Sequence, residues 1–380
     1  MYRTVLSAVA LLILAWTPAT STTWYILPDG SGDAPTIQAG IDSASVGDTV
    51  SLGCGTYYEH NVQMKSGIYL QSVTGSPECA TIDGQSMGRV LECGYVDETG
   101  IVRGLRITGG DTSGGSAGGI GCNYGSRVVI ERCDIVGNVS GWGGGIAMDA
   151  AAAPTIRECV IRDNHANYPS AGLGGGIYTG SSTGVVIEHC VISGNSAVAG
   201  GGIGVDVLSS PLIHGCLIVG NSAWDGGGLR LEGMSTATLE DCTVAGNQGG
   251  SGGGIEGYWV ELTIHRSIVW GNCATYEGDE LYFWGPENSV AVTCSAVDSM
   301  GIEGNASITW DSSSTFENPQ FCDPESCENA PTILGDYTLM NTSPCLDAPG
   351  CGLIGDLGEG CAEPTSTEPA SWGSVKKLFR

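Results

Sequence analysis

The sequence predicts an all-β fold, a parallel β-helix with three faces, and two of the observations that predict it are repeats. A cysteine recurs at residues 133, 159, 190, 216 and 242, in steps of 26, 31, 26 and 26 residues. An asparagine stands five residues after each cysteine, and glycine triplets begin at residues 143, 174, 200, 226 and 252. Self-similarity at a period of about 20 to 50 residues is typical of a solenoid, in which each repeat packs on its neighbours.

The third observation is a period of two within each repeat. In one repeat the apolar residues stand two apart in three short runs, Cys190 and Ile192, Ile203 and Val205, and Pro211 and Ile213. A period of two indicates strands with one buried face. Three strands repeated in the same order predict a coil with three faces, each strand stacked in parallel about 4.8 Å from its counterpart.

The asparagine and glycine columns are expected to be structural. Asparagine tolerates the left-handed conformation of a corner, and stacked copies are expected to pair their amides along the axis. Glycine permits positive φ and a close approach between coils. A repeated catalytic or phosphate-binding loop stays open as the alternative, although no segment matches GxxxxGK[ST]. The asparagines concerned are Asn138, Asn164, Asn195, Asn221, Asn247 and Asn272.

Three parts are expected along the chain. Residues 1–21 are typical of a signal peptide, because Arg3 precedes an apolar run from Val5 to Trp16 that is too short to span a membrane comfortably. Residues 22–362 are expected to form the β-helix with a cap at each end. Residues 363–380 are expected to be a linker and a short basic tail.

A short helix is expected to cap the N-terminal end. In the segment TIQAGIDSA, Ile37, Ile41 and Ala44 fall on one helical face, and Pro35 suits a first turn. A solenoid needs such a plug because its first coil otherwise exposes apolar side chains and unpaired edges. The C-terminal stretch DYTLMNTSPCLDAPGCGLIGDLGEGC is expected to supply the last coils and the other cap.

The charge balance restricts the partners. The chain has 41 acidic and 14 basic residues, a net charge of −27. This argues against a nucleic acid, and the field repels an acidic polyuronate unless calcium intervenes. No cofactor is expected: calcium is compatible with the acidity, but GGIGVDVLS at residues 201–209 matches the calcium nonapeptide only once. No metal site is expected, since no CxxC pairs with a second CxxC.

Sixteen cysteines in an exported chain suggest disulfides. The five that recur in the repeats are expected to form a buried stack of mostly free thiols, because cysteine buries well as a small apolar side chain. Pairing of Cys322 with Cys327, and pairing among Cys345, Cys351 and Cys361, is expected to staple the C-terminal segment. The other candidates for disulfides are Cys54, Cys79, Cys93, Cys122, Cys273 and Cys294.

Several motifs resemble those of a known family. The opening TIQAGIDSASVGDTV, the repeated GGGI and CxIxGN elements, and the closing GDYTLMNTSPC and CGLIGDLG resemble secreted bacterial right-handed parallel β-helix proteins of the pectin-lyase-like superfamily. The GGGI and asparagine elements are also similar to polymorphic outer membrane protein repeats. The resemblance covers residues 24–361 and implies a right-handed coil at the cell surface or outside the cell. It leaves function open, since the superfamily includes lyases, glycosidases and adhesins.

No catalytic residue can be carried over from that superfamily. The paired Asp-Asp, His-Gly and Arg-Ile-Lys motifs of polygalacturonases are absent, and no lysine lies between Lys65 and Lys376, although an arginine base stays open. The charges that precede each cysteine position alternate in sign, which is expected to pair them between coils, with a binding stripe or acid/base site as the alternative. They are Glu131, Arg157, Glu188, His214, Glu240 and His265.

Aromatic residues lie between the asparagines and the glycine triplets. Exposed aromatic rings on a rigid elongated face offer a surface on which a sugar chain stacks. The alternative is that these rings pack over apolar corners. The candidate ligand-binding residues are Trp142, Asn167, Tyr168, Trp224 and Tyr276.

The leading hypothesis is an exported, non-catalytic surface or extracellular protein that binds glycan or is adhesive through one face. Its partner is expected to be an extracellular polysaccharide or a cell-surface component, and the chain is not expected to be an integral membrane protein. A polysaccharide lyase or glycoside hydrolase is the first alternative, and a structural envelope protein is the second. A cluster of three or more carboxylates with an arginine would favour the enzyme.

Overall fold

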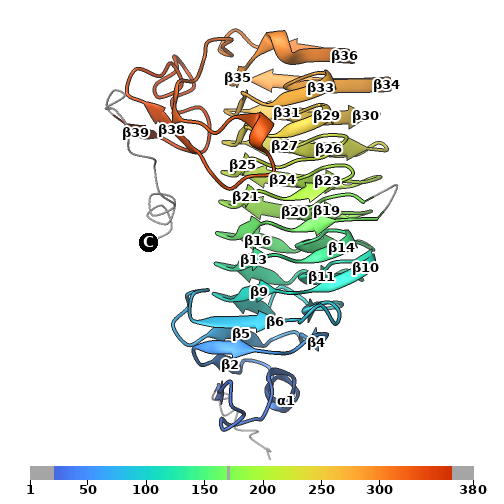
Figure 1. Ribbon diagram of the computed structural model, residues 1–380, viewed down its shortest axis with the longest axis vertical. Coiled ribbons are helices and arrows are strands. Elements are labelled where there is room, and N and C mark those ends of the chain that lie inside the picture. The colour runs from blue at the N-terminus through green and yellow to red at the C-terminus, as the bar shows by residue number, and fades with distance from the viewer. Residues whose placement is uncertain (1–20, 169–171, 362–380) are drawn as a thin grey trace, which may run out of the picture.

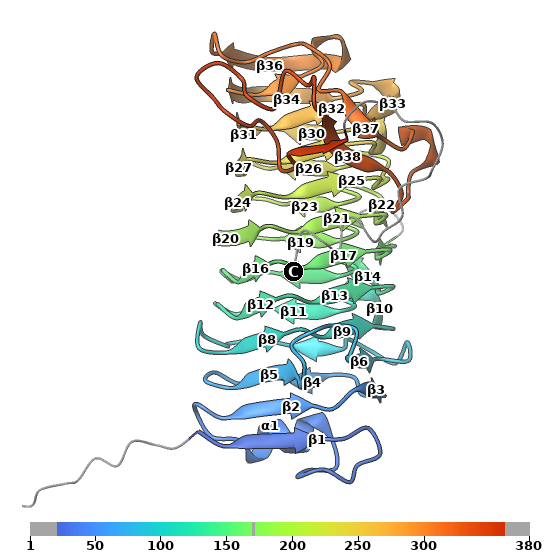
Figure 2. The ribbon, with the colours of Figure 1, turned by 90° about the vertical axis from the view of Figure 1, so that its left-hand side faces the viewer.

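A computed structural model describes residues 21–168 and 172–361 of the chain. They form a parallel β-helix in which each coil contributes one strand to each of three faces (Figures 1 and 2). Equivalent strands of successive coils pair in parallel, so Ile120 lies opposite Ile146 and Ile146 opposite Ile177. The predicted fold class is therefore confirmed. The predicted signal peptide, apart from residue 21, and the predicted tail lie outside the described residues.

The strands fall into stacked columns. The first face holds β1 (Thr23–Ile26), β2 (Thr49–Leu52), β5 (Tyr69–Ser72), β8 (Ile101–Arg103), β12 (Val129–Glu131), β16 (Thr155–Arg157), β20 (Thr183–Glu188), β24 (Ser210–His214), β27 (Thr236–Glu240) and β31 (Glu261–His265). The second face holds β3 (Gly55–Tyr57), β6 (Ala80–Asp83), β9 (Arg106–Thr108), β13 (Asp134–Val136), β17 (Val160–Arg162), β21 (Val191–Ser193), β25 (Leu217–Val219), β28 (Thr243–Ala245), β32 (Ile268–Trp270) and β35 (Ala296–Val297).

The third face holds β4 (Val62–Gln63), β7 (Leu91–Glu92), β11 (Ile120–Cys122), β15 (Ile146–Met148), β19 (Ile177–Thr179), β23 (Ile203–Val205), β26 (Leu229–Glu232) and β30 (Ile255–Tyr258). Two long strands, β34 (Leu281–Thr293) and β36 (Ile302–Trp310), continue both the third and the first face at the C-terminal end. Between the second and third faces lie β10 (Asp111–Ser116), β14 (Val139–Trp142), β18 (His165–Ala166), β22 (Ser196–Ala197), β29 (Gln248–Ser251) and β33 (Cys273–Glu277).

The N-terminal end is closed by α1 (Ile37–Ser43), which lies at that end of the solenoid in Figure 1. The Thr36 hydroxyl accepts a hydrogen bond from the Ala39 N–H and so caps the helix. Ile37 and Ile41 are fully buried, and Gly40 lies against the side chain of Ile26 in β1. The predicted capping helix is confirmed.

The interior is built from columns of identical or similar side chains. One column on the first face is fully buried and in register from coil to coil: Ile130, Ile156, Ile187, Ile213, Leu239 and Ile264. The five recurrent cysteines are also buried and unpaired, and Cys242 Sγ donates to the Ile213 carbonyl of the preceding coil at 3.3 Å. Burial raises the pKa of the Cys190, Cys216 and Cys242 thiols, which keeps them protonated. The predicted thiol stack is confirmed.

A ladder of asparagine side chains runs up one buried corner. Each Nδ2 donates to the Oδ1 of the next asparagine, as from Asn195 to Asn221 at 3.0 Å and from Asn221 to Asn247 at 3.0 Å. The same Oδ1 atoms accept the backbone N–H of the preceding asparagine, and each Nδ2 also donates to a buried carbonyl. The ladder therefore satisfies polar backbone groups that the corner removes from water, and the predicted structural role of this column is confirmed.

The C-terminal segment does not form the last coils that the sequence suggests. After β36 the chain turns back and runs along the outside of the solenoid, where β37 (Phe321–Asp323), β38 (Asp336–Met340) and β39 (Glu359–Cys361) form a small sheet (Figure 1). The short 3₁₀ turn η2 (Cys327–Asn329) lies in this segment, while η1 (Ser299–Gly301) precedes β36. Leu339 and Ile354 pack with Leu217 and Ile268 of the second face in a second hydrophobic core.

The disulfides explain how this segment is held. Cys273 pairs with Cys327 and Cys294 with Cys351, so both bonds join the solenoid to the returning segment. Cys322 pairs with Cys361, and Cys54 pairs with Cys79 in adjacent N-terminal coils. The predicted pairing of Cys322 with Cys327 is wrong, as is pairing among Cys345, Cys351 and Cys361, because each partner lies on an element distant in sequence. Cys345, Cys93 and Cys122 are buried free thiols.

Candidate functional site

The predicted ligand-binding residues lie on the corner between the asparagine ladder and the glycine triplets. Trp142 ends β14, and Tyr168 lies one coil further along. Their rings stack with centroids 4.7 Å apart and an interplanar angle of 25°. Asn167 lies beside them, half-buried, and its backbone N–H donates to the Ser140 carbonyl at 2.7 Å. The structure thus brings three of the five predicted residues together.

Trp224 and Tyr276 form a second aromatic pair on the same corner. Their ring centroids are 5.5 Å apart, although a whole coil separates the two residues. The intervening coil places Gly250 under the indole, where an added Cβ would lie 3.3 Å from a Trp224 ring atom. The absence of a side chain at Gly250 therefore leaves room for the two rings to meet across this coil. Trp224 is 61% exposed and Tyr276 63%, so the pair faces solvent.

The four rings form two pairs rather than one continuous ridge. The coil between Tyr168 and Trp224 carries no aromatic residue at this corner and presents Val198, which is half-buried. We call the surface made by Trp142, Tyr168, Trp224 and Tyr276 the aromatic corner. A rigid stack of strands supports it, because the adjacent glycine triplets pair coil to coil through their backbone amides, as from Gly227 to Gly252 at 3.0 Å.

Beside the second aromatic pair lies a group of charged residues that the sequence analysis missed. Arg230 in β26 and Glu256 in β30 are opposite each other in register, with Arg230 Nη1 2.5 Å from Glu256 Oε1. Glu232 lies 3.7 Å from Arg230 Nη2, and Trp284 Nε1 donates to Glu256 Oε1 at 2.8 Å. Asp225 follows Trp224 in the chain. We call the four residues Asp225, Arg230, Glu232 and Glu256 the Arg230 cluster.

Arg230 and Glu256 of the cluster are buried although their strands turn these side chains away from the core, while Asp225 and Glu232 are half-buried. The Arg230 and Glu256 side chains are 5% and 3% exposed. The Trp284 indole covers the guanidinium, whose Cζ lies 5.7 Å from the ring centroid, and the Tyr258 ring packs against Trp284 at 4.2 Å. Glu256 Oε2 has no hydrogen-bond partner. The cluster is therefore a desolvated ion pair under an aromatic cover.

Desolvation also changes the acidity of the carboxyls in the cluster. Burial raises the pKa of Glu256 to about 7, against the opposing effect of Arg230. Burial likewise raises the pKa of Asp225 and of Glu232, again against the attraction of Arg230. Three carboxyls thus surround one guanidinium, and the Glu256 carboxyl changes protonation near neutral pH. This arrangement can hold or transfer a proton at Glu256.

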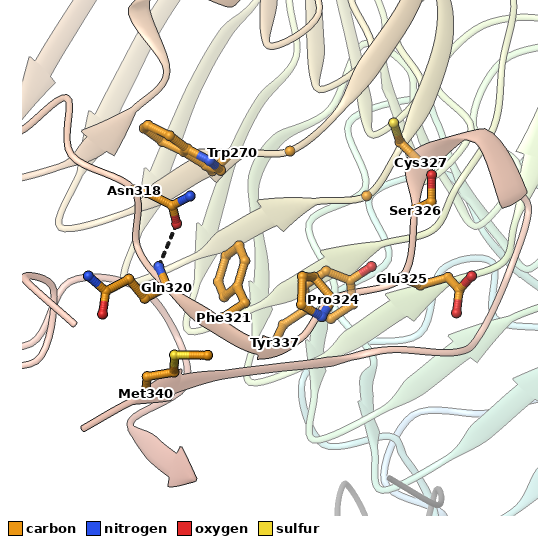
Figure 3. Close-up of a pocket in the computed structure, with 12 residues that line it drawn as sticks. Trp270, Asn318, Gln320, Phe321, Pro324, Glu325, Ser326, Cys327, Tyr337 and Met340 are labelled. Carbon is orange, nitrogen blue, oxygen red and sulfur yellow. Dashed lines mark hydrogen bonds between the residues drawn. The ribbon is translucent and has the colours of Figure 1, made fainter. Parts of the chain in front are cut away.

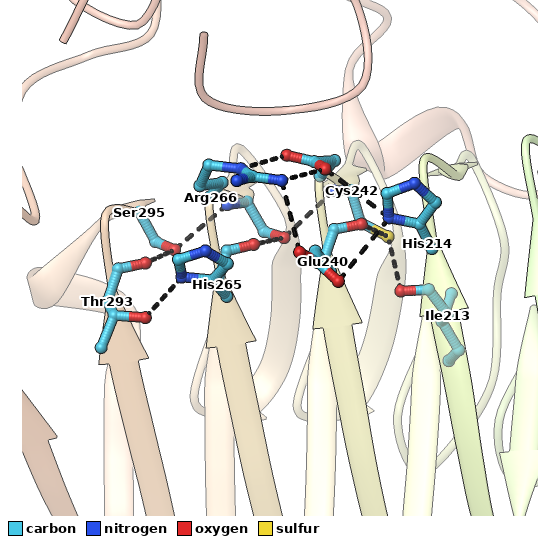
Figure 4. Close-up of polar contacts among 10 residues, drawn as sticks. Ile213, His214, Glu240, Cys242, His265, Arg266, Thr293 and Ser295 are labelled. Atoms are coloured by element: carbon cyan, nitrogen blue, oxygen red, sulfur yellow. Dashed lines mark hydrogen bonds and ion pairs between the residues drawn. The ribbon is translucent and has the colours of Figure 1, made fainter. Parts of the chain in front are cut away.

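The charges that precede the cysteines lie in register on the first face, and Figure 4 shows His214, Glu240 and His265 among them. Arg157 Nη2 lies 2.6 Å from Glu131 Oε2, and Arg266 Nη2 lies 3.3 Å from Glu240 Oε1. His214 and Glu240 face each other in register between β24 and β27. The predicted pairing of opposite charges between coils is confirmed for Glu131 with Arg157. The partner of Glu240 is Arg266, which the prediction did not include, while the predicted His265 lies against Thr293 Oγ1. Asp241, one residue further, receives two bonds from Arg266, at 2.7 and 2.6 Å.

A cavity of about 550 Å³ lies where the returning C-terminal segment meets the solenoid (Figure 3). Trp270 of β32 lines it from the solenoid, and Phe321, Tyr337 and Met340 line it from the returning segment. Glu325 is the only charged residue in its lining. The cavity therefore offers an apolar surface with little chemistry to orient a ligand.

Arg230 and Glu256 could have been found from the sequence by comparing another column of the repeats. The position directly after each GGGI or GGGL element reads Ala147, Tyr178, Gly204, Arg230 and Glu256. Small residues give way to an arginine and a glutamate in adjacent coils, and a parallel solenoid must bring such neighbours together. The stacked pair Tyr95 and Tyr124, with ring centroids 4.8 Å apart, was missed because it precedes the regular repeats.

Within residues 21–168 and 172–361, no helix has both the length and the apolar character that crossing a bilayer requires. No curated protein matches the sequence. Among solved structures, pectate lyase Pel9A is similar at 12% identity with a TM-score of 0.53, over 90% of this chain and 97% of that chain. This likeness shows a shared fold.

Two further solved structures are less similar to the chain. The A-module of the mannuronan C-5 epimerase AlgE4 from Azotobacter vinelandii is 18% identical with a TM-score of 0.40, over 74% of this chain and 95% of that chain. A polygalacturonase from Erwinia carotovora ssp. carotovora is 15% identical with a TM-score of 0.40, over 83% and 98%.

A family model described as "Right handed beta helix region" matches residues 58–203 and 170–321. These two overlapping matches span more than half of the 380 residues. They agree with the parallel register of all three faces, the buried thiol stack and the asparagine ladder. The chain belongs to the family of right-handed β-helix proteins.

Proposed function

We propose that the chain is an exported, non-catalytic protein that binds a neutral polysaccharide along the aromatic corner. The observation that carries this proposal is the pair of solvent-facing aromatic contacts, Trp142 with Tyr168 and Trp224 with Tyr276, on one corner of a rigid solenoid. Tyr168 is 37% exposed, and the two rings of the second pair are more than half exposed. Such rings give a sugar chain apolar faces on which to stack.

The spacing of the pairs suits an extended chain. Five coils separate Trp142 from Tyr276, and at about 4.8 Å per coil the two ends of the aromatic corner are roughly 24 Å apart. The strands beneath fix the rings before a ligand arrives, so binding loses little backbone entropy. A linear polymer that reaches both pairs therefore gains from two contacts at once.

Charge selects the class of polymer. The net charge of −27 repels acidic polysaccharides, and the Arg230 cluster beside the second pair has three carboxyls for one guanidinium. A neutral polysaccharide pays no such electrostatic cost. Export is supported by the four disulfides, because such bonds persist in oxidising compartments.

The test is affinity electrophoresis of the purified protein through gels that contain one neutral polysaccharide each. We expect at least one polysaccharide to retard the wild type, and the double variant Trp142→Ala with Trp224→Ala to lose that retardation. The matched control is Tyr95→Ala with Tyr124→Ala, which removes another stacked and exposed aromatic pair from a different turn. Equal retardation of all three proteins, each with native thermal unfolding, would remove the aromatic corner from the proposal.

A second candidate, a polysaccharide-cleaving enzyme, is favoured by the Arg230 cluster. Glu256, with a pKa of about 7 raised by burial, could act as a general acid near neutral pH. The assay measures reducing ends and unsaturated products over neutral and acidic polysaccharides, with and without calcium. Activity that Glu256→Gln abolishes would support the enzyme and contradict the non-catalytic proposal. No product from any polysaccharide would leave the binding function alone in place.

A further inference from the structure

His214 lies at the end of β24 with its ring directed at two carboxylates of the next coil (Figure 4). Its Nδ1 atom is 3.6 Å from Asp241 Oδ2 and 3.9 Å from Glu240 Oε2. One ligand atom from each of these three residues falls within 4.8 Å of the other two. All three side chains are partly exposed.

The His214 ring nitrogen is the unusual feature of this group. Nδ1 has no contact with solvent and no hydrogen-bond partner, because both carboxylate oxygens are too far for a hydrogen bond. Other imidazoles of the solenoid are satisfied: His265 Nδ1 lies 2.7 Å from Thr293 Oγ1, and His165 Nδ1 lies 2.7 Å from Ser196 Oγ. Of the three histidines His165, His214 and His265, only His214 has a buried Nδ1 without a hydrogen-bond partner.

The spacing of the three atoms is somewhat wider than that of ligands which share a small cation. Zinc binds histidine nitrogen and carboxylate oxygen at about 2.0–2.2 Å, which puts neighbouring ligand atoms of a tetrahedral site roughly 3.3–3.5 Å apart. His214 Nδ1 lies 3.6 and 3.9 Å from the two carboxylate oxygens, and all three ligand atoms lie within 4.8 Å of one another, so the side chains must draw together around an ion. The strands that carry them are in register, so little backbone movement is needed.

We propose that His214, Glu240 and Asp241 form a binding site for a divalent transition-metal ion such as Zn²⁺. Imidazole with carboxylates suits zinc, copper and nickel, whereas calcium and magnesium prefer oxygen ligands alone. Three protein ligands leave one position of a tetrahedral ion open to water or to another ligand.

Arg266 is the competitor for this site. Its guanidinium donates to both oxygens of Asp241 and lies 3.3 Å from Glu240 Oε1, so it neutralises the two carboxylates when no metal is bound. A metal ion must displace at least one of these bonds. Two further titratable groups lie near the site. The His189 ring meets the His214 ring edge-on, with centroids 5.2 Å apart, and Asp356 of the returning segment interacts electrostatically with Asp241.

The experiment is isothermal titration of the full secreted chain, freed of any affinity tag, with Zn²⁺ alone. We expect one ion per chain, with binding about tenfold or more weaker in His214→Ala, since even loss of an outer-shell partner of a metal costs that much. Glu240→Gln is the second variant should His214→Ala unfold. His60→Ala, which removes an exposed imidazole far from the site, is the matched control and should bind as the wild type does.

Arg266→Ala makes the test specific, because a mere loss of structure cannot strengthen binding. We expect this variant to bind Zn²⁺ more tightly than the wild type, since it frees both carboxylates. Co²⁺ in place of Zn²⁺ should give the visible absorption of a tetrahedral site in the wild type and not in His214→Ala. Equal binding by the wild type and His214→Ala, or binding by Arg266→Ala no tighter than that of the wild type, would overturn the proposal.

Discussion

The Glu280 carboxylate closes the asparagine ladder by accepting a hydrogen bond from Asn272 Nδ2 at 2.5 Å. Its other oxygen accepts the backbone N–H groups of Gly271 and Asn272, at 2.7 and 3.3 Å. The two bonds from Asn272 are those that the next asparagine accepts elsewhere in the ladder. Glu280 stands where earlier coils have the third glycine of a triplet, so one substitution provides the end of the column.

Burial of the Glu280 carboxyl makes stability depend on pH, against the opposing effect of its hydrogen bonds to Asn272 and Gly271. Burial raises the pKa of Glu280 to about 8, so the folded chain holds this proton more tightly than the unfolded chain does. The resulting stabilisation is complete below the unfolded pKa near 4.5 and is lost as pH rises toward 8. Urea unfolding at several pH values should show this fall, and Glu280→Gln should reduce it by roughly 2–4 kcal/mol. An identical pH profile for both proteins would contradict the assignment.

Removal of one internal asparagine should cost more than removal of a surface one. In Asn221→Ala the Asn195 amide and its backbone N–H lose their acceptor, and the Ile192 carbonyl loses its donor. Buried groups without partners lower the free energy of unfolding, here by about 2–4 kcal/mol. Urea denaturation measures this, with the exposed Asn329→Ala as control. A cost equal to that of the control would show that the ladder is not needed for stability.

The free thiols should be inert in the folded chain. All eight unpaired cysteines are buried, and burial keeps thiols such as Cys190 and Cys216 protonated. Titration with a thiol reagent should find no reactive cysteine in native protein and eight after unfolding in urea without reductant. Labelling of the native thiol column, or fewer than eight thiols after unfolding, would contradict this arrangement.

The buried ion pair of the Arg230 cluster should be costly to break from one side. Arg230→Ala leaves Glu256 without its cation under the Trp284 ring and should lower the free energy of unfolding by about 3–5 kcal/mol. Replacement of both residues by methionine should cost less, since no unpaired charge remains. Arg127→Ala breaks an exposed pair with Glu98 and should cost below about 1 kcal/mol. Equal unfolding free energies for the two single variants would show that the cluster is solvated.

The sequence was sufficient for the coil because the repeats record its register directly. Cys190 and Cys216 recur with Asn195 and Asn221 at one step, and a parallel stack is the arrangement that buries all four. The path of the C-terminal segment was not predictable, because it has no repeat. Its two disulfides to the solenoid each span a long stretch of sequence, 54 residues from Cys273 to Cys327 and 57 residues from Cys294 to Cys351. Such pairings depend on where the segment packs.

The candidate site was predictable only in part. The column between asparagine and glycine indicated Trp142 and Trp224, but not that rings would meet in two pairs or that Gly250 would leave room for one of them. Arg230 and Glu256 were missed because single residues in one column carry no signal until the adjacent coil is compared. The His214 group is harder still to predict from the sequence, since it joins His214 to two successive residues of the next coil, Glu240 and Asp241. The orientation of the His214 ring toward them is a property of the fold.

The most direct measurement is calorimetric titration of the wild type with oligosaccharides of increasing length, cut from a neutral polysaccharide that retards it in a gel. We predict that affinity rises with length until one chain reaches both Trp142 and Tyr276. We also predict that the double variant Trp142→Ala with Trp224→Ala loses this gain, while Tyr95→Ala with Tyr124→Ala keeps it. The same length dependence in the Trp142 and Trp224 double variant would contradict polysaccharide binding at the aromatic corner.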